Sequence, residues 1–568
     1  MTYVVEDDIE GWSDSIEALL NCYFKNNPYT GRKIVFDFSR IRKKGTPLKT
    51  SGGRAPGYKG LKNTLSKIKK LLDHIIEDKN QKRLKAINAC DIICYCSDAV
   101  LSGGNRRSAV SVLFDEDDED MINAKAMIPV IKYSSFEKDG STTIGGKTFF
   151  FYCGKVVIDG LSYDVKIKDF EYENLKSNKL INWLYIHPQR ARTNNSVVLL
   201  KEDLSIEKLR FVINRTRQYG EPGFVLVTDN QQVMNPCFEI SAIPITSDGI
   251  CGMQMCNLTS INGALVDTKE KFRECVEAET ILGTLQATYT DFTYLSQTAK
   301  ELTSNESLLG SSITGFMDNP KILLDPGIQK EMALFAVNVN EIWAKKLGIN
   351  PAARVTCAKP EGTSTLVLSQ KDIFVASGIH PHHAKRYFRR VQANTVDPVY
   401  KFFKKYNSHA CEPSVWSANQ TDDVITFPIE IKQQAIFKED LTAIQHLELI
   451  RITQQNWVLN GVSKINKKPV THNVSCTVIV KPEEWEDVIN YIFKNRQFFT
   501  AVSFIPASGD KDYTQAPMEA VVTEEDEKHW KEIVSKFNHV DYKSFKEEED
   551  NTTLAQEITC YGGACQIV

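Results

Sequence analysis

The stretch NPCFEI, residues 235–240, places a thiol and a carboxylate two residues apart beside a turn signal. Asn-Pro disfavours helix at Asn235 and starts a turn. On extended backbone, alternate side chains point to the same side, so Cys237 and Glu239 are predicted to share one face. A sulfur and a base would then converge there. For any single thiol, a buried structural cysteine is the ordinary alternative.

Two further segments carry chemical groups next to turn-rich sequence. CGMQMCNLTSING, residues 251–263, contributes Cys251 and Cys256. CAKPEGTSTLVL, residues 357–368, offers backbone N–H groups and hydroxyls at a predicted helix start, which is typical of an anion site. An ordinary capped helix is the alternative.

No metal or mononucleotide motif stands out. His380, His382 and His383 are too bunched on a Pro-containing turn for a convincing zinc site, so no metal is predicted. No G-x-G-x-x-G follows a strand, and no P-loop is present.

Composition narrows the classes of protein. The chain has 568 residues, 42% of them hydrophobic and 25% charged, with a formal net charge of -3, so it lacks the basic footprint of a nucleic-acid-binding protein. Its N-terminus does not resemble a signal peptide, and no run of about 18 apolar residues suggests a membrane span. Fourteen cysteines are too few for a disulfide scaffold. We therefore expect a cytoplasmic protein with mostly reduced thiols.

The motifs, taken together and in order, resemble those of ribonucleotide reductases, specifically the monomeric adenosylcobalamin-dependent ribonucleoside-triphosphate reductases of class II. The likeness spans nearly the whole chain. The segments that carry it are EDDIEGW (6–12), FDFSRIRKKGTPLKTSGGRAPG (36–57), SGGNRRSA (102–109), RTNNSV (192–197), GEPG (220–223), NPCFEI (235–240), CNLTSIN (256–262), KPEGTSTL (359–366), GIHP (378–381), YFRRVQAN (387–394), SFIP (503–506) and CYGGAC (560–565).

The resemblance implies an α/β fold, the ten-stranded α/β barrel of ribonucleotide reductases, with a central finger loop and an incomplete N-terminal edge. It divides the chain into four parts. These are an effector-site and loop region of the barrel (1–127), a small β-rich insertion (128–182), the catalytic barrel with its finger loop (183–543) and a mobile redox tail (544–568).

The resemblance also implies roles for the residues of the finger loop. Cys237 would be the thiyl radical that abstracts the 3'-hydrogen of the ribose, Glu239 would take the proton of the 3'-hydroxyl, and Asn235 would hydrogen-bond the sugar. Cys256 would be one of two thiols that supply reducing equivalents as the 2'-hydroxyl leaves as water. Cys251 does not match the family's motif and is predicted to be structural.

Two nucleotide sites follow from the same likeness. The substrate phosphates would bind at Gly362, Thr363, Ser364 and Thr365. Glu361 departs from the family, which has a small polar residue there, and its carboxylate must point away from a phosphate. A dNTP or ATP effector would bind near Arg42 and the 44–57 loop and act on the active site through Gly104, Asn105, Arg106 and Arg107.

The radical source is predicted by elimination and likeness to be adenosylcobalamin. Class I enzymes use a pair of adjacent tyrosines, which this chain lacks. Class III enzymes use a glycyl radical motif and a four-cysteine zinc site, and neither is evident in this sequence. A class I large subunit remains an alternative, as do a catalytically incomplete fragment that binds nucleotides or a partner, and a different thiol-radical enzyme.

The terminal thiols Cys560 and Cys565 are expected to shuttle electrons from thioredoxin or a similar dithiol protein to the active site by thiol exchange. The family has a segment before EDDIEGW that carries the cysteine partner of Cys256. We therefore expect a separate N-terminal polypeptide to supply it. Reduction at normal rates by the chain alone would contradict this expectation.

Overall fold

The computed structural model describes most of the chain. The described residues are 1–24, 27–46, 55–77, 83–99, 109–144, 147–158, 160–292, 294–370, 373–415, 422–507, 515–546, 560–561 and 564–565. In these residues no helix is both long and apolar enough to cross a membrane.

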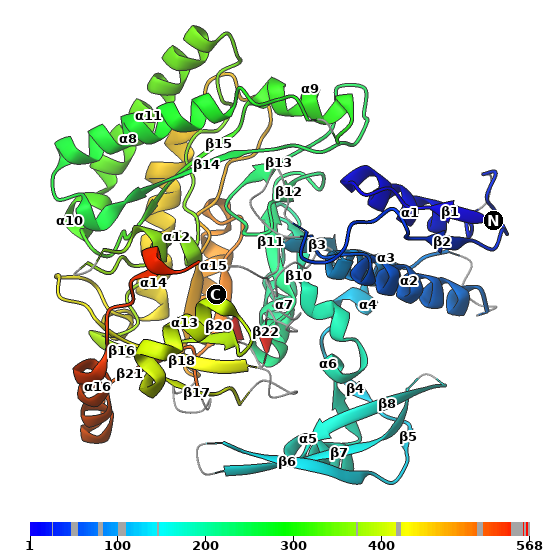
Figure 1. Ribbon diagram of the computed structural model, residues 1–568. Coiled ribbons are helices and arrows are strands. Elements are labelled where there is room, and N and C mark those ends of the chain that lie inside the picture. The colour runs from blue at the N-terminus through cyan, green and yellow to red at the C-terminus, as the bar shows by residue number, and fades with distance from the viewer. Residues whose placement is uncertain are drawn as a thin grey trace.

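Two groups of parallel strands form the centre of the molecule (Figure 1). The first has the order β11-β10-β3, and its strands are β3 (Val110–Asp115), β10 (Thr193–Leu200) and β11 (Gly223–Val227). All pairs in it are parallel.

The second group begins with the parallel pair β14 (Asn257–Asn262) and β15 (Leu309–Thr314). Parallel bridges then join Ser311 to Thr356 and Ala358 to Val474. The chain after Val474 continues into β19 (Thr477–Val480), which pairs in parallel with β20 (Ser503–Pro506). Five neighbouring segments thus run in one direction, which requires helical crossovers between them.

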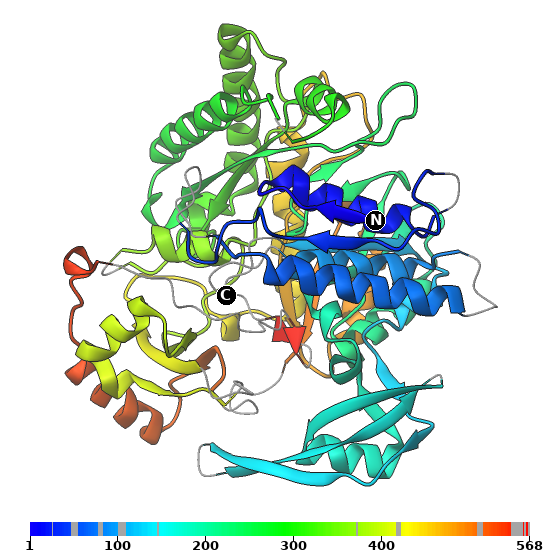
Figure 2. The ribbon, with the colours of Figure 1, turned by 45° about the vertical axis from the view of Figure 1, so that its right-hand side comes forward.

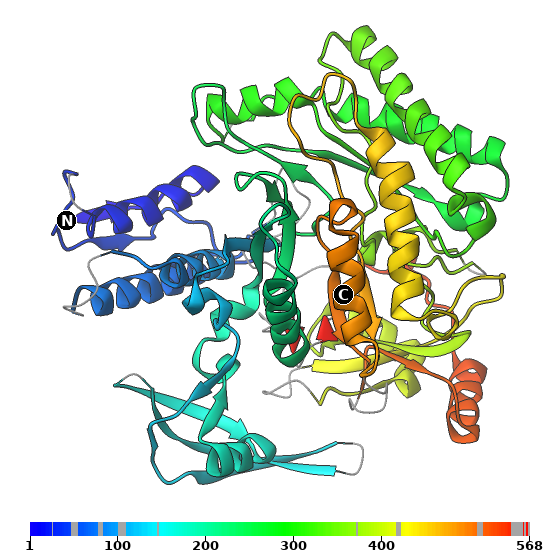
Figure 3. The same cartoon turned by 180° about the vertical axis from the view of Figure 1, so that it is seen from behind.

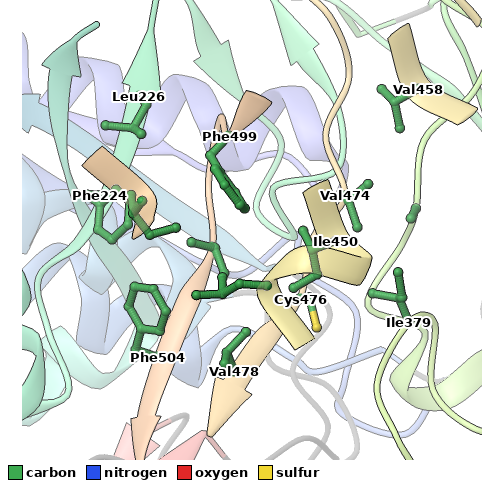
Figure 4. Packing of buried hydrophobic residues seen from close by; sticks show 14 of the residues in the cluster. Phe224, Leu226, Ile379, Ile450, Val458, Val474, Cys476, Val478, Phe499 and Phe504 are labelled. Carbon is green, nitrogen blue, oxygen red and sulfur yellow. The ribbon is translucent and has the colours of Figure 1, made fainter. Parts of the chain in front are cut away.

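Amphipathic helices supply those crossovers and cover the strands. They are α7 (Ile206–Tyr219), α8 (Lys269–Gln286), α11 (Pro326–Leu347), α14 (Ala443–Thr453) and α15 (Trp485–Lys494). Figure 3 shows α7, α15 and α14 side by side on the back of the molecule. Their apolar faces and the strands enclose one large core, in which Phe224 stacks on Phe504 on one side and Val474 lies beside Ile450 on the other (Figure 4). Burial of these side chains holds the two groups of strands together.

A smaller unit precedes the parallel strands. Its elements are β1 (Thr2–Val4), α1 (Ile9–Asn21), β2 (Val35–Asp37), α2 (Lys59–Glu77) and α3 (Ala86–Ala99). β1 and β2 pair in parallel, and buried side chains such as Leu61 and Leu65 of α2 give the unit its own core. In Figure 2 this unit lies across the front of the parallel strands, with α2 beside α3.

An antiparallel sheet projects from the body at its lower end (Figure 1). Its strands are β5 (Lys132–Tyr133), β6 (Glu137–Ile144), β7 (Lys147–Ile158) and β8 (Leu161–Lys168), and α5 (Asp169–Asn178) packs on it. The pair β4 (Met127–Pro129) and β9 (Leu180–Asn182) forms its stem. Val156, Ile167 and Leu175 are buried in its separate core.

A second antiparallel sheet, of order β17-β18-β16-β21, lies at the lower left in Figure 1. Its elements are β16 (Arg386–Asn394), α13 (Pro398–Asn407), β17 (Cys411–Pro413), β18 (Asp422–Glu430), β21 (Met518–Ala520) and α16 (Glu524–Lys536). The remaining elements are short: α4 (Glu119–Ile122), α6 (Trp183–Ile186), η1 (Pro188–Arg192), β12 (Val233–Met234), β13 (Ser241–Ala242), η2 (Gly263–Leu265), α9 (Gln297–Glu306), α10 (Pro320–Leu323), α12 (Gly362–Leu368), η3 (Ser408–Ala410), η4 (Lys438–Asp440), η5 (Gln454–Val458), η6 (Leu459–Gly461), η7 (Arg496–Phe498), η9 (Tyr542–Ser544), β22 (Cys560–Tyr561) and β23 (Ala564–Cys565).

The predicted α/β class is confirmed by these parallel groups and their helices. In the part of the chain that is described, the groups hold three and five parallel strands, short of the ten predicted. Within the same residues, no strand pairs with the outer edge of β3 or of β14. An unpaired parallel edge leaves backbone N–H and C=O groups without ladder partners.

Close packing at Gly310 of β15 gives a first test of the core. A Cβ atom there would lie 2.4 Å from Leu258 Cδ2, 2.9 Å from Ile240 Cδ1 and 3.2 Å from Cys357 Sγ. We expect Gly310→Ala to lower stability by about 1–3 kcal/mol through overpacking, measured as the urea midpoint. Gly327→Ala is the control, because only Asp325 Oδ1, at 3.2 Å, lies near its added Cβ. Equal midpoints for the two variants would contradict the prediction.

Candidate active site

A short hairpin carries the predicted thiol and carboxylate. β12 and β13 pair antiparallel, and residues 235–240 form the tip between them. The Asn235 N–H donates to the Ile240 carbonyl at 3.0 Å, and Asn235 Oδ1 accepts the Ile240 N–H at 2.9 Å. The Phe238 N–H donates to the Asn235 carbonyl at 2.9 Å. Residues 235–238 therefore make a β-turn, with Pro236 at its second position, where proline is favoured.

The prediction that Cys237 and Glu239 lie on extended backbone with side chains on one face is wrong. Phe238, between them, has a φ of 62°, in the left-handed region. The turn separates their environments: Cys237 is exposed, whereas Glu239 is 1% exposed. The sulfur therefore faces outward and the carboxylate faces the core.

Burial raises the pKa of Glu239, while a hydrogen bond with the Asn235 side chain and the positive charge of Lys359 act to lower it. Its Oε2 atom has no hydrogen-bond partner in the described structure. A buried carboxylate with a raised pKa and a free oxygen is suited to accept a proton at neutral pH.

Cys256 lies immediately before β14 and is half-buried against Ile240 and Cys357. Burial first, and then the negative charge of Glu239, raise the pKa of Cys256 to about 12. The Cys237 thiol contributes in the same direction, so Cys237, Glu239 and Cys256 lie within electrostatic reach of one another. Cys256 is therefore a protonated thiol at neutral pH.

Cys357 is a neighbour of this site that the sequence analysis did not single out. It is fully buried, and burial first, then Glu239, raise its pKa well above the usual range. It follows Thr356, on the strand next to β15. Only the strand order, in which residue 357 comes beside β15, brings it close to Cys256.

Glu361 points away from the turn surface, as the sequence requires for phosphate binding. Its side chain is fully buried and accepts hydrogen bonds from the hydroxyls of Ser260 and Ser364. Lys359 Nζ lies 3.3 Å from Glu361 Oε1 and donates to Ser260 Oγ at 2.9 Å. The carboxylate is thus neutralised by its own loop and by β14.

The predicted phosphate-binding residues form the first turn of α12. Thr365 donates its hydroxyl hydrogen bond to the Glu361 carbonyl, and its Oγ1 lies 3.0 Å from Thr314 Oγ1 of β15. Gly362 and Ser364 belong to the same turn; the side chain of Thr363 lies outside the described part. Phosphate binding by these residues stays a prediction.

The predicted effector residues are only partly described. Arg42 Nη2 donates to the Asp7 carbonyl at 3.1 Å and its Nε pairs with the Asp7 carboxylate at 2.5 Å. Gly104, Asn105, Arg106 and Arg107 lie outside the described residues. In the tail, β22 and β23 pair antiparallel with Cys560 directly opposite Cys565.

The structure also places Cys251 and one of the clustered histidines. Cys251, predicted to be structural, is exposed, and its backbone forms an antiparallel bridge to Ile245. His382 contacts Asp318 at 2.7 Å, as a buried pair. Across the described ranges, no three or more His, Cys, Asp or Glu side chains gather where they could hold a metal ion.

Sequence analysis also missed the segment 472–475, which hydrogen-bonds the finger loop. Asn473 Nδ2 donates to the Phe238 carbonyl at 2.9 Å, and Ser475 Oγ donates to the Cys237 carbonyl at 2.6 Å. The sequence feature that could have drawn attention to this segment is the polar run His-Asn-Val-Ser, which ends one residue before the apolar strand TVIV. Nothing local links it to residues more than 230 positions earlier.

The environments of the thiols predict their order of reactivity. At pH 8 we expect iodoacetamide to label Cys237 and Cys251, which are exposed, and to spare Cys256 and Cys357. A thiol with a pKa of about 12 carries about a thousandfold less thiolate at this pH than an ordinary cysteine. Peptide mass spectrometry after timed labelling measures the rates. Labelling of Cys256 as fast as Cys251 would show that Cys256 is not shielded as described.

Comparisons with known proteins find relatives of one enzyme class. Residues 1–72 match a family model described as "B12-dependent ribonucleotide reductase, insertion domain". The adenosylcobalamin-dependent ribonucleoside-triphosphate reductase of Lactobacillus acidophilus is 23% identical, over 100% of this chain and 70% of that protein. A probable enzyme of the same name from Dictyostelium discoideum is 24% identical, over 100% of this chain and 64% of its own length.

A solved structure titled as a B-12 dependent (class II) ribonucleotide reductase superposes with a TM-score of 0.63 at 19% identity, covering 95% of this chain and 68% of the other. This likeness concerns the fold. The chain is thus similar along its whole length to adenosylcobalamin-dependent ribonucleoside-triphosphate reductases, has the fold of a class II ribonucleotide reductase, and begins with a match to the insertion domain of B12-dependent members.

Proposed function

We propose that this chain reduces ribonucleotides to 2'-deoxyribonucleotides for DNA synthesis, and that its substrates are ribonucleoside triphosphates. The observation that carries the proposal is the finger-loop turn. It presents an exposed Cys237 and a buried, proton-accepting Glu239, with the Cys256 thiol beside them, in a chain whose relatives are ribonucleoside-triphosphate reductases. We place the reaction in the cytoplasm, where thiols stay reduced.

The residues of the loop have separate tasks in this reaction. The Cys237 thiyl takes the 3'-hydrogen atom of the ribose and returns it at the end. Glu239 accepts the proton of the 3'-hydroxyl, which its raised pKa favours. Asn235, bonded to the Glu239 carboxylate, orients that base and can reach the sugar.

Cys256 and a second thiol supply the two electrons. The C2'–O bond breaks and the hydroxyl leaves as water with one thiol hydrogen, the other thiol hydrogen forms the new C2'–H bond, and the two sulfurs join as a disulfide. The balance is ribonucleotide plus dithiol giving deoxyribonucleotide, disulfide and water. A pKa of about 12 keeps Cys256 protonated until this step, so it can act as a hydrogen donor.

Adenosylcobalamin is the proposed radical source, and the fit can be judged at Cys237. Its side chain is exposed, so a large cofactor can approach it from outside the strands. When bound, the cofactor would supply the radical that converts the Cys237 thiol to a thiyl. The chain's own part is to present that sulfur while keeping Glu239 buried and Cys256 half-buried.

Substrate and effector would bind at two separate sites. The turn at Gly362, Thr363, Ser364 and Thr365 would hold the substrate phosphates. A dNTP or ATP effector would bind near Arg42 and act through residues 104–107. Neutralisation of Glu361 by Lys359 supports the first of these assignments, because it removes the charge that would repel a phosphate.

The proposed electron donors are thioredoxin or a similar dithiol protein, acting through Cys560 and Cys565. The hairpin register, which sets these two residues opposite each other, supports their closing into a disulfide. A further polypeptide would contribute a strand along the edge of β14 and a thiol for Cys256. The unpaired edge of that strand in the described structure supports such a partner.

A class I large subunit is the second candidate. It is the alternative that the sequence left open, and it predicts a different source of the radical. Reduction that needs a metal-containing radical subunit, with adenosylcobalamin inert, would establish it.

Activity of the chain is the main test. We expect deoxyribonucleotide formation from ribonucleoside triphosphates with adenosylcobalamin, thioredoxin and, if needed, the strand-donating polypeptide. Cys237→Ser should abolish it, because serine cannot form the radical under these conditions. Cys560→Ser should leave about one product per enzyme with thioredoxin, because only the pre-reduced active site can turn over. Chromatography of the nucleotides measures both.

Cys251→Ser is the matched control, since Cys251 is another exposed cysteine in the neighbouring segment. It should keep full activity. Full activity of Cys237→Ser would refute the proposal, and full multiple turnover of Cys560→Ser would remove the tail from it.

The pH dependence of the rate tests Glu239. A base must be deprotonated, so the rate rises with pH through the pKa of Glu239, which burial raises. Asn235→Ala removes a hydrogen bond that lowers this pKa, and the acid limb should therefore move to higher pH. Rates at saturating substrate between pH 5 and 9 measure the shift. A limb that stays in place or moves down would mean that Glu239 is not the titrating base.

A further inference from the structure

Three consecutive carbonyls of the finger loop are bound by one segment, residues 473–475. Ser475 Oγ donates to the Cys237 carbonyl at 2.6 Å, Asn473 Nδ2 to the Phe238 carbonyl at 2.9 Å, and the Asn473 N–H to the Glu239 carbonyl at 2.9 Å. None of these carbonyls lies in a regular strand. The loop backbone is thus fixed from one side, residue by residue.

The preceding residue fixes the base of the hairpin. The Ser241 N–H donates to His472 Nδ1 at 3.3 Å, and His472 Nε2 contacts the Leu309 carbonyl at 2.8 Å. Burial first, then the charge of Arg354, lower the pKa of His472 to about 3. The ring is therefore neutral, accepts at Nδ1 and donates at Nε2, and joins β13 to β15.

Gln454 holds Asn473 itself in place. Its Nε2 donates to the His472 carbonyl and its Oε1 accepts the Val474 N–H, both at 2.9 Å, so it spans the backbone on either side of Asn473. Gln454 is 2% exposed and begins η5, a π-helical turn. Such turns are rare and are frequent at functional sites.

Asn473 also ties the loop to the segment that leads into β20. Its Nδ2 donates to the Ala501 carbonyl at 2.9 Å, and its Oδ1 accepts the Ala501 N–H at 3.4 Å. The side chain is 2% exposed. All of its hydrogen-bonding groups are therefore used by backbone, which fixes its rotamer.

The hydrogen bonds act where the loop is least stable by itself. A left-handed φ is unfavourable for a bulky residue such as Phe238. Without external donors the turn would relax, and Cys237 and Glu239 would lose their separate environments. The two side-chain hydrogen bonds to the neighbouring carbonyls offset this cost.

We propose that Asn473 and Ser475 are positioning residues that hold the loop backbone at residues 237–239, and so set the places of the Cys237 sulfur and the Glu239 carboxylate. The catalytic part of this proposal rests on the proposed ribonucleotide reduction. The structural part, that these two side chains make the loop rigid, does not depend on that reaction.

Hydrogen exchange of the peptide covering residues 235–241, followed by mass spectrometry, tests the structural part. Ser475→Ala loses one hydrogen bond at a half-buried site and should raise the exchange rate of this peptide about 3- to 10-fold. Asn473→Ala should raise it further, and if that variant fails to fold, Ser475→Ala alone decides. Ser475→Thr keeps a hydroxyl and should restore the wild-type rate.

Steady-state kinetics with adenosylcobalamin and thioredoxin test the catalytic part. Ser475→Ala should lower kcat about tenfold with KM changed less than twofold, because the proposed phosphate-binding turn is untouched; Ser475→Thr should recover kcat. Ser535→Ala, which removes a serine-to-carbonyl bond on α16, is the control and should change neither exchange at 235–241 nor kcat.

The outcomes separate the two proposals. Unchanged exchange at residues 235–241 in Ser475→Ala overturns the positioning role. Faster exchange with unchanged kcat, or a loss confined to KM, overturns its catalytic part. A wild-type protein that reduces no ribonucleotide under any of these conditions refutes the proposed function, while exchange still decides whether the two side chains hold the loop.

Discussion

The left-handed backbone of Phe238 is the constraint on which the site depends. It lies between Cys237 and Glu239 and turns their side chains into opposite environments, one exposed and one buried. The radical sulfur proposed at Cys237 would have to be reachable from outside, whereas burial away from water raises the pKa of a carboxylate and makes it a better base. Two residues of ordinary extended chain would give both groups the same surroundings. One unfavourable dihedral therefore provides both conditions.

The order of the parallel segments brings the other groups to that turn. Residue 474 pairs with 358, and 356 pairs with 311 of β15, which pairs with β14. Neighbouring segments consequently place Asn473, Cys357 and Cys256 around the same loop. Burial of the outer faces under the helices, as around Val474 and Phe504, keeps these segments in register (Figure 4).

The α/β class followed from the resemblance to a known family, whereas the short motifs that carry chemistry could be read directly from the sequence, because turn signals and residue spacing are local. Asn235 and Pro236 indicated a turn, and the hairpin tip begins there. The extended backbone predicted for Cys237 and Glu239 was wrong because donors from Asn473 and Ser475 hold the tip. Contacts between residues so distant in sequence leave no periodicity or spacing to read. Cys357 was missed for the same reason, since only strand order brings it to Cys256.

Glu361 shows how a residue that departs from a family pattern is accommodated by charge. Its buried carboxylate accepts from Ser260 and Ser364 and pairs with Lys359. The positive charge of Lys359 lowers the pKa of Glu239 and the negative charge of Glu361 raises it, so their effects on this carboxylate oppose each other. A lysine alone would favour the ionised base and weaken it, and a glutamate alone would repel a phosphate. As a pair they leave the turn close to neutral, so that its backbone N–H groups, rather than a net charge, would set the affinity for substrate phosphates.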